Sequence, residues 1–153
     1  MVPVDSPVQP ATSTMMLRDR ASAMLGMSPT VLEPGHAVVS MTVRDDMLNG
    51  FEICHGGFMT LLADSAFAFA CNSYNELTVA SGFSVDIVAP ARLGDQLTAV
   101  ATEVALAGRT GVYDINVRNQ RGELVAAFRG KSYRIKGKPT VPGLLGPSAG
   151  DPQ

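Results

Sequence analysis

The sequence predicts a single α+β domain in which an antiparallel β-sheet curls around one long helix. Residues 58–71, FMTLLADSAFAFAC, form an apolar run with a single charge, as expected of a helix inside a core. After residue 77 come four segments rich in strand-forming residues, and short turns separate the last three, which indicates antiparallel hairpins. A curled sheet over one helix is the arrangement that buries both.

Length and charge restrict the possible functions. The chain has 153 residues, 46% of them hydrophobic, and its net charge is −2, which argues against nucleic acid as a partner. No apolar run approaches the roughly 20 residues that span a bilayer, and the N-terminus does not resemble a secretory signal. We therefore expect no membrane contact. Cys54 and Cys71 are expected to be free thiols, which indicates a cytoplasmic protein.

The two ends of the chain look different from its middle. Residues 1–12 contain three prolines and little to bury, so we expect a disordered arm. Residues 137–153 contain four prolines and four glycines, so we expect a flexible tail. The folded domain is therefore expected over residues 13–136.

The elements follow in order from local signals. A short first helix is expected over residues 13–26, where Ser13 or Thr14 can cap it and Gly26 can end it. Valine-rich alternation over residues 36–44 predicts a strand, and a loop follows. The long helix is expected from Gly57 to Asn75, on the order of 27 Å. Later strands are expected over residues 78–88, 96–107, 110–119 and 123–135.

Gly56 and Gly57 mark the start of the long helix as a place where a ligand can approach the backbone. Neither has a side chain, and N–H groups of a first helical turn lack intrahelical partners. The helix dipole is also positive there. Such donors can polarise a carbonyl and stabilise a developing oxyanion.

Asp64 is the one charge in the apolar run. Burying a carboxylate costs free energy unless it is paired, so this residue is a candidate catalytic acid or base. It lies eight residues after Gly56, about 12 Å along the helix axis. The two groups of one chain cannot reach the same small atom, so a shared reaction centre requires two copies across a symmetric interface. Asp64 shares its helix face with Gly57, Thr60, Leu61 and Ala68.

Several segments resemble the hotdog-fold acyl-CoA thioesterases, in particular the PaaI type of phenylacetic acid degradation. The resemblance covers roughly residues 15–136. It is carried by HGG at 55–57, LADSAFA at 62–68 and ACNS at 70–73, and further by MLNG at 47–50, TGVYDI at 110–115 and FRGKS at 128–132.

This resemblance implies a hotdog fold, homodimers with joined sheets and usually homotetramers. It implies that the Gly56 N–H polarises the thioester carbonyl and that Asp64 of the partner subunit acts as general base or nucleophile. Asn49 matches a polar residue near the attacking water or the carbonyl, and His55 matches a supporting histidine. Ser81 is the best match to a residue that places water.

We therefore expect a hydrolase that acts on phenylacetyl-CoA or a hydroxylated aryl-acetyl-CoA, without cofactor or metal. The acyl-CoA substrate carries phosphates that Arg or Lys should meet. Residues 129 and 131 share one strand face and residues 134 and 136 the other, so the four cannot all contact one ligand. The candidate substrate-binding residues are Gly57, Phe51, Phe58, Ser81, Arg92, Arg109, Lys131 and Arg134.

Other interpretations stay open. Asp64 could be a structural acid, His55 a structural hydrogen-bonder, and the basic residues 129–136 a solvated face, while Phe67 and Phe69 are expected in the core. Cys54 and His55 are not expected to form a nucleophile–base pair, because adjacent side chains seldom orient that way. The alternative functions are a medium-chain or hydroxybenzoyl-CoA thioesterase on the same fold, or a non-catalytic acyl-CoA-binding sensor.

Overall fold

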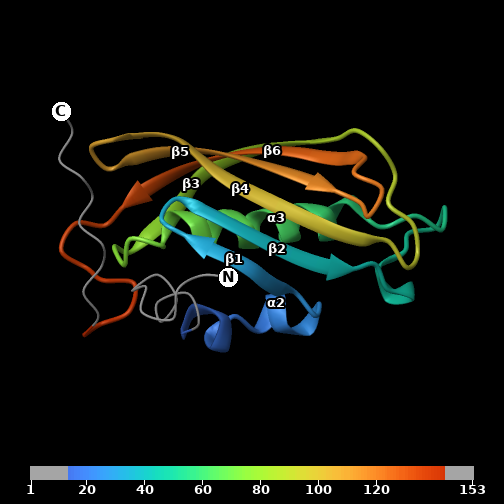
Figure 1. Cartoon of the computed structure of the whole chain (residues 1–153), viewed down its shortest axis with the longest axis horizontal. Coiled ribbons are helices and arrows are strands. Elements are labelled where there is room, and N and C mark those ends of the chain that lie inside the picture. The colour runs from blue at the N-terminus through green and yellow to red at the C-terminus, as the bar shows by residue number, and fades with distance from the viewer. Residues whose placement is uncertain (1–13, 144–153) are drawn as a thin grey trace.

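A six-stranded antiparallel sheet wraps around one long helix, α3, in a computed structural model that describes residues 14–143 (Figure 1). The strand order is β1-β2-β4-β5-β6-β3, and every pairing is antiparallel. The α+β hotdog architecture expected from the sequence is confirmed. The predicted arm at residues 1–12, and the predicted tail from residue 144 on, lie outside the described residues.

The elements are bounded as follows. The strands are β1 (Ser28–Glu33), β2 (His36–Thr42), β3 (Thr78–Ile87), β4 (Gln96–Ala107), β5 (Thr110–Arg118) and β6 (Leu124–Arg134). The helices are α2 (Arg20–Met24), α3 (Gly56–Cys71) and the short 3₁₀ helix η1 (Asp45–Met47), and residues 14–18 are also helical.

Polar side chains limit α3 at both ends. Nδ1 of His55 accepts a hydrogen bond from the Gly57 N–H at 3.4 Å and caps the first turn. At the other end, Nδ2 of Asn72 donates to the carbonyls of Ala68 and Thr78, each at 3.0 Å. The expected helix over residues 57–75 therefore ends earlier, because Asn72 replaces the next helical turn with contacts to β3.

Phe67 fixes α3 against the sheet. Its ring centroid lies 5.5 Å from that of Tyr113 and 6.0 Å from that of Phe128. A β-carbon added at Gly130 would lie 2.8 Å from the Phe67 ring, so glycine there lets the helix approach β6 closely. Phe67 and Phe69 are both buried, as expected of core residues.

Two features of the N-terminal part differ from the prediction. The sequence indicates one strand before the long helix, but β1 precedes β2 and pairs with it at the sheet edge. Pro29 weakens the strand signal of β1, and an edge strand can accept proline. The expected helix over residues 13–26 is divided at Asp19, whose side chain caps α2 by accepting from the Ser22 N–H at 2.9 Å.

β3 forms the opposite edge, and its inner face is incompletely covered. Phe83 and Ile87 point toward the helix side of the sheet but are 50% and 46% exposed. Phe83 stacks on Phe128 at 4.7 Å between ring centroids, with its other side open. Unpaired backbone groups along such an edge can accept a further strand.

The chain stays hydrogen-bonded to the domain beyond the predicted boundary at residue 136. The Leu77 N–H donates to the carbonyl of Lys138 at 2.8 Å, and the Val141 N–H donates to Oδ1 of Asn75 at 2.8 Å. The Thr140 hydroxyl donates to Oδ1 of Asn72 at 2.8 Å. Residues 138–141 thus cover the turn between α3 and β3.

Cys54 and Cys71 are free thiols, as the sequence predicts, and both are buried. Across residues 14–143, no helix combines the length and the apolar character that crossing a bilayer requires. The described residues also contain no group of three or more His, Cys, Asp or Glu side chains that could hold a metal ion.

Candidate active site

A cavity of about 540 Å³ and one of about 510 Å³ lie at opposite ends of β3. The smaller one, here called the apolar cavity, lies where the first turn of α3 meets the end of β3 and the connection to β4. Most of its lining side chains are apolar, which suits an apolar ligand group. Its lining residues are Asn49, Ile53, Cys54, Gly56, Met59, Ile87, Val88, Ala89 and Pro90.

Gly56 presents an available backbone donor to the apolar cavity. The residues before it are held firmly, since the Cys54 N–H donates to the Ala91 carbonyl at 2.7 Å and the His55 N–H to the Met47 carbonyl at 2.8 Å. The Gly56 N–H itself has no hydrogen-bond partner among residues 14–143. An unpartnered donor at a helix start, beside a cavity, can bind a carbonyl oxygen.

Asn49 also borders the apolar cavity, and its amide orientation follows from its contacts. Oδ1 accepts from the Phe51 N–H at 2.9 Å and from the Ile53 N–H at 3.4 Å. The oxygen is therefore engaged within the loop over residues 49–53. Nδ2 is the atom of this amide that remains to donate to a ligand.

The other residues predicted around the glycine turn have different surroundings. His55 is the helix cap, with its ring edge-on to Phe58 at 6.5 Å between centroids. Phe58 is half-buried against the core, whereas Phe51 is 85% exposed at the tip of its loop. Gly57 is exposed, and its N–H is engaged by His55.

Asp64 is a partly buried carboxylate on the one stripe of α3 that the sheet leaves partly uncovered. It makes no hydrogen bond or ion pair with any residue of the described range 14–143. Burial raises the pKa of Asp64 above its ordinary value, and the nearby charge of Asp19 raises it further. The stripe comprises Gly57, Thr60, Leu61, Asp64 and Ala68, the face that the sequence predicts.

The larger cavity, here called the basic cavity, lies near the start of β3. Four cationic residues line it: Arg109 from the turn between β4 and β5, Arg134 at the end of β6, and Lys136 and Lys138 beyond it. Only Glu76 contributes a negative charge among the lining residues. Such a concentration of cations suits an anionic ligand.

Arg134 is the least exposed of these cations. Its Nη1 lies 3.0 Å from Oε2 of Glu76, and its guanidinium lies 5.0 Å from the ring centroid of Tyr74. Its Nη2 is buried without a hydrogen-bond partner in the described part of the chain. A buried donor without a partner is costly, so an acceptor supplied by a ligand would stabilise the site.

Arg109 and Arg134 therefore share one cavity, but the other predicted substrate-binding residues do not join them. Lys131 is exposed on β6, where it pairs with Gly82 of β3. The hydroxyl of Ser81 donates to the Lys131 carbonyl at 3.2 Å, in an irregular part of β3.

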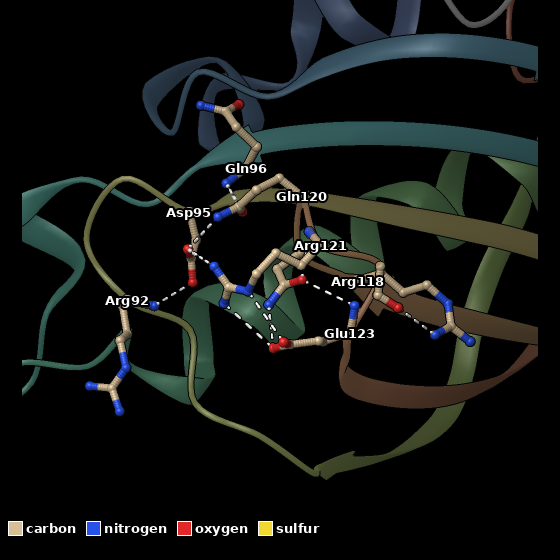
Figure 2. A network of polar contacts seen from close by, with 9 residues as sticks. Arg92, Asp95, Gln96, Arg118, Gln120, Arg121 and Glu123 are labelled. Atoms are coloured by element: carbon tan, nitrogen blue, oxygen red, sulfur yellow. Dashed lines mark hydrogen bonds and ion pairs between the residues drawn. The ribbon is translucent and has the colours of Figure 1, made fainter.

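Arg92 lies at the opposite end of the sheet, in a turn held by Asp95. Asp95 accepts from the Arg92 N–H at 2.8 Å and from Nε2 of Gln120 at 2.9 Å (Figure 2). The Gln120 hydrogen bond is the main reason why the pKa of Asp95 lies below its ordinary value. The Arg92 guanidinium points away from this network, which joins the β3–β4 connection to the β5–β6 turn.

Sequence reasoning missed some of the residues at the basic cavity, among them Tyr74, which contacts Arg134, and Lys138, which lines the cavity. Tyr74, beneath the Arg134 guanidinium, follows an apolar run and gives no local signal. Lys138 belongs to the expected flexible tail, but its carbonyl accepts from the Leu77 N–H and its N–H donates to the Ile135 carbonyl, which holds it at the cavity.

Residues 51–126 match the family model described as the thioesterase superfamily. The chain is 47% identical over 123 residues to the acyl-coenzyme A thioesterase PaaI of Escherichia coli K12, a match covering 80% of this chain and 88% of that protein. This identity extends beyond the family-model match.

Solved structures show the same similarity. The E. coli PaaI protein from the phenylacetic acid degradation operon superposes with a TM-score of 0.84 at 44% identity, covering 86% of this chain and 96% of that one. A Streptococcus mutans protein solved with bound acetyl CoA superposes with a TM-score of 0.69 at 27% identity, covering 71% and 88%.

Proposed function

Since the chain belongs to the thioesterase superfamily and is an acyl-CoA thioesterase of the PaaI type, we propose that it hydrolyses phenylacetyl-CoA or a ring-hydroxylated aryl-acetyl-CoA to the free acid and CoA. The choice of acyl group is supported by the operon named for the E. coli relative. It is also supported by the apolar walls of the cavity beside Gly56, which suit an aromatic ring.

One observation carries the proposed mechanism. Asp64 is a partly buried carboxylate that has no hydrogen-bond or ion-pair partner among residues 14–143, and its pKa is raised mainly by burial. A structural acid in such a place would be expected to have a partner. A carboxylate kept without one, on the open face of α3, is available to a substrate or a water molecule.

The reaction centre requires a second subunit. Gly56 and Asp64 of one chain are about 12 Å apart along α3, too far to act on one carbonyl. We place the partner along the free edge of β3, where Phe83 and Ile87 leave apolar surface exposed. The reaction centre then combines Gly56 of one subunit with Asp64 of the partner subunit, and pairs of such dimers would form the homotetramer.

In the proposed reaction, the thioester carbonyl oxygen accepts a hydrogen bond from the Gly56 N–H. Asp64 of the partner subunit takes a proton from water as the water oxygen bonds to the carbonyl carbon. Collapse of the tetrahedral intermediate breaks the C–S bond and releases CoA as a thiolate. Direct attack by the Asp64 carboxylate, through an anhydride that water then opens, reaches the same products. Asn49 can donate from Nδ2 to the carbonyl or to the water.

The basic cavity is the proposed site for the phosphates of CoA. With antiparallel β3 strands paired about Phe83, Ile87 would lie opposite Val79 of the partner subunit. The start of the partner's β3, and with it the partner's basic cavity, would then come close to the apolar cavity of the first subunit. The pantetheine arm of CoA would bridge the two, with Arg109 and Arg134 contacting phosphate.

We further propose that the protein acts in the cytoplasm, because both of its cysteines are buried free thiols. Neither thiol takes part in the proposed reaction. Burial raises the pKa of the Cys54 thiol to about 11, so it stays protonated and is a poor nucleophile even though it borders the apolar cavity.

The test is release of free thiol from phenylacetyl-CoA, acetyl-CoA, hexanoyl-CoA and hydroxybenzoyl-CoA by wild type and Asp64→Asn. We expect the highest kcat/KM with the aryl-acetyl ester and a loss of most of kcat in the variant, which should still dimerise. Preference for another ester with the same Asp64 dependence would overturn the substrate and leave the mechanism. Tight binding without turnover of any ester would indicate a sensor instead.

A further inference from the structure

The N-terminal segment meets α3 through a buried chain of hydrogen bonds next to Asp64. The Ser22 hydroxyl donates to Oδ2 of Asp19 at 2.6 Å, because a carboxylate can only accept. The hydroxyls of Ser22 and Ser65 are 2.8 Å apart, so Ser65 donates to Ser22. Both serines are buried, and Ser65 follows Asp64 directly in α3.

A second contact brings Asp19 to the same part of the helix. Asp19 and Ala68 line one cavity of about 400 Å³. Ala68 lies one helical turn after Asp64 on the same partly uncovered stripe. The Asp19 carboxylate is thus held beside Asp64 by a polar chain through Ser65 and by a shared cavity at Ala68.

We propose that Asp19 is a positioning residue for the reaction, which keeps a second negative charge beside Asp64 and so makes Asp64 a stronger base. This inference rests on the proposed function, because it gives Asp19 a role only if Asp64 accepts a proton. A carboxylate beside another carboxylate holds its proton more strongly. A more basic carboxylate is a better proton acceptor once it is ionised.

None of the other groups near Asp64 supplies a second negative charge. Within α3, Cys71 lies two turns further on and is neutral, since burial raises its pKa to about 12. The β3 side chains that face the helix, including Phe83 and Ile87, are uncharged. Arg18 lines the same cavity as Asp19 but is exposed, and Arg134 of β6 is bound to Glu76.

The experiment is the pH dependence of kcat/KM for thioester hydrolysis by the full chain, from about pH 4 to pH 9. Asp19→Asn removes the charge and keeps a good helix cap. We expect its acidic limb to move to lower pH and its plateau kcat to fall about two- to ten-fold. Asp45→Asn, which removes an exposed acid from η1, should leave the profile of wild type unchanged.

Ser22→Ala tests the hydrogen-bonded chain separately from the charge of Asp19. It breaks the chain to Ser65 but leaves the Asp19 carboxylate, which still accepts from the backbone N–H of residue 22. We therefore expect a lower melting temperature, with an acidic limb that stays closer to that of wild type than to that of Asp19→Asn. If Asp19→Asn fails to fold, Asp19→Ser removes the same charge and also caps the helix.

An acidic limb of Asp19→Asn that coincides with wild type, in a protein of unchanged fold, would overturn the inference. Failure of the proposed function looks different, because wild type would then show no hydrolysis that depends on Asp64. The Asp64→Asn variant, assayed alongside, distinguishes the two results.

Discussion

The position that a β-carbon would take on Gly56 lies 3.5 Å from Cγ1 of Ile87, so these two residues face each other in the wall of the apolar cavity. This is an ordinary contact distance, and an added methyl group would fit without moving the backbone. In the proposed reaction, however, it would occupy space that the thioester needs in order to reach the Gly56 N–H.

We therefore expect Gly56→Ala to fold normally and to lose about 10- to 100-fold in kcat, because the substrate carbonyl is displaced from its donor. The measurements are the melting temperature and steady-state hydrolysis. Gly50→Ala is the matched control, since no atom lies within 4 Å of the added carbon there. Equal activity of Gly56→Ala and wild type would show that this N–H does not bind the carbonyl.

Asp64→Asn should make the protein more stable although it loses most of kcat. The folded-state pKa of Asp64 is raised, so its carboxyl contributes stability at low pH that is lost as pH rises through that pKa. Asparagine removes the charge, and we expect the melting temperature near pH 7 to rise by about 1–3 °C. The gain should vanish in acid, and a lower melting temperature at every pH would indicate that Asp64 has a stabilising partner.

Arg109→Ala should weaken recognition of CoA without changing the chemistry. Arg109 lines the basic cavity and also donates from Nη1 to the Tyr133 hydroxyl at 3.1 Å. We expect KM for acyl-CoA to rise about ten-fold, with kcat retained and with no effect on an acyl-pantetheine that lacks the nucleotide. Arg118→Ala removes a cation from the other end of β5 and serves as control. Equal losses with both esters would place the phosphates elsewhere.

Asp95 should be needed for stability at neutral pH. Its pKa is lowered, chiefly by the Gln120 hydrogen bond, so its contribution is present above the unfolded pKa and is lost as pH falls through the folded pKa. Asp95→Asn should lower the free energy of unfolding by about 1–3 kcal/mol near pH 7, measured by denaturant titration. The difference should shrink below about pH 4. Asp46→Asn, at an exposed ion pair, should cost less than about 1 kcal/mol.

Most of the fold can be predicted from the sequence, because the segments with the clearest local patterns adopt the secondary structure that those patterns indicate. The apolar run of α3 and the last three strands have regular patterns and short turns, and their boundaries differ from the prediction by at most one residue outside the helix C-terminus. The observed α3 ends before the predicted Asn75 because Asn72 exchanges a helical turn for contacts with Thr78 and Thr140, residues that lie outside the helix. The sequence does not indicate β1, because Pro29 is acceptable in a strand only at the sheet edge, and that place is known only from the fold.

Some residues of the candidate site can likewise be predicted from the sequence, and others only from the fold. Gly56 and Asp64 could be selected from local spacing and from the resemblance to a known family, and Asn49 from that resemblance. Asp19 could not, because Ser22 and Ser65, whose contact brings it to α3, are 43 residues apart in sequence. Arg92 and Arg109 lie before and after β4, which places them at opposite ends of the sheet, whereas the pairing of β5 with β6 brings Arg134 to Arg109.

The most direct test of the two-subunit site is complementation between Gly56→Ala and Asp64→Asn. Each variant alone should have little activity. Subunits mixed at random by refolding or coexpression should form about half mixed dimers, each with one intact site, and so recover roughly a quarter of wild-type activity. Mixed dimers that form but recover no activity would contradict a reaction centre built from Gly56 of one subunit and Asp64 of the partner subunit.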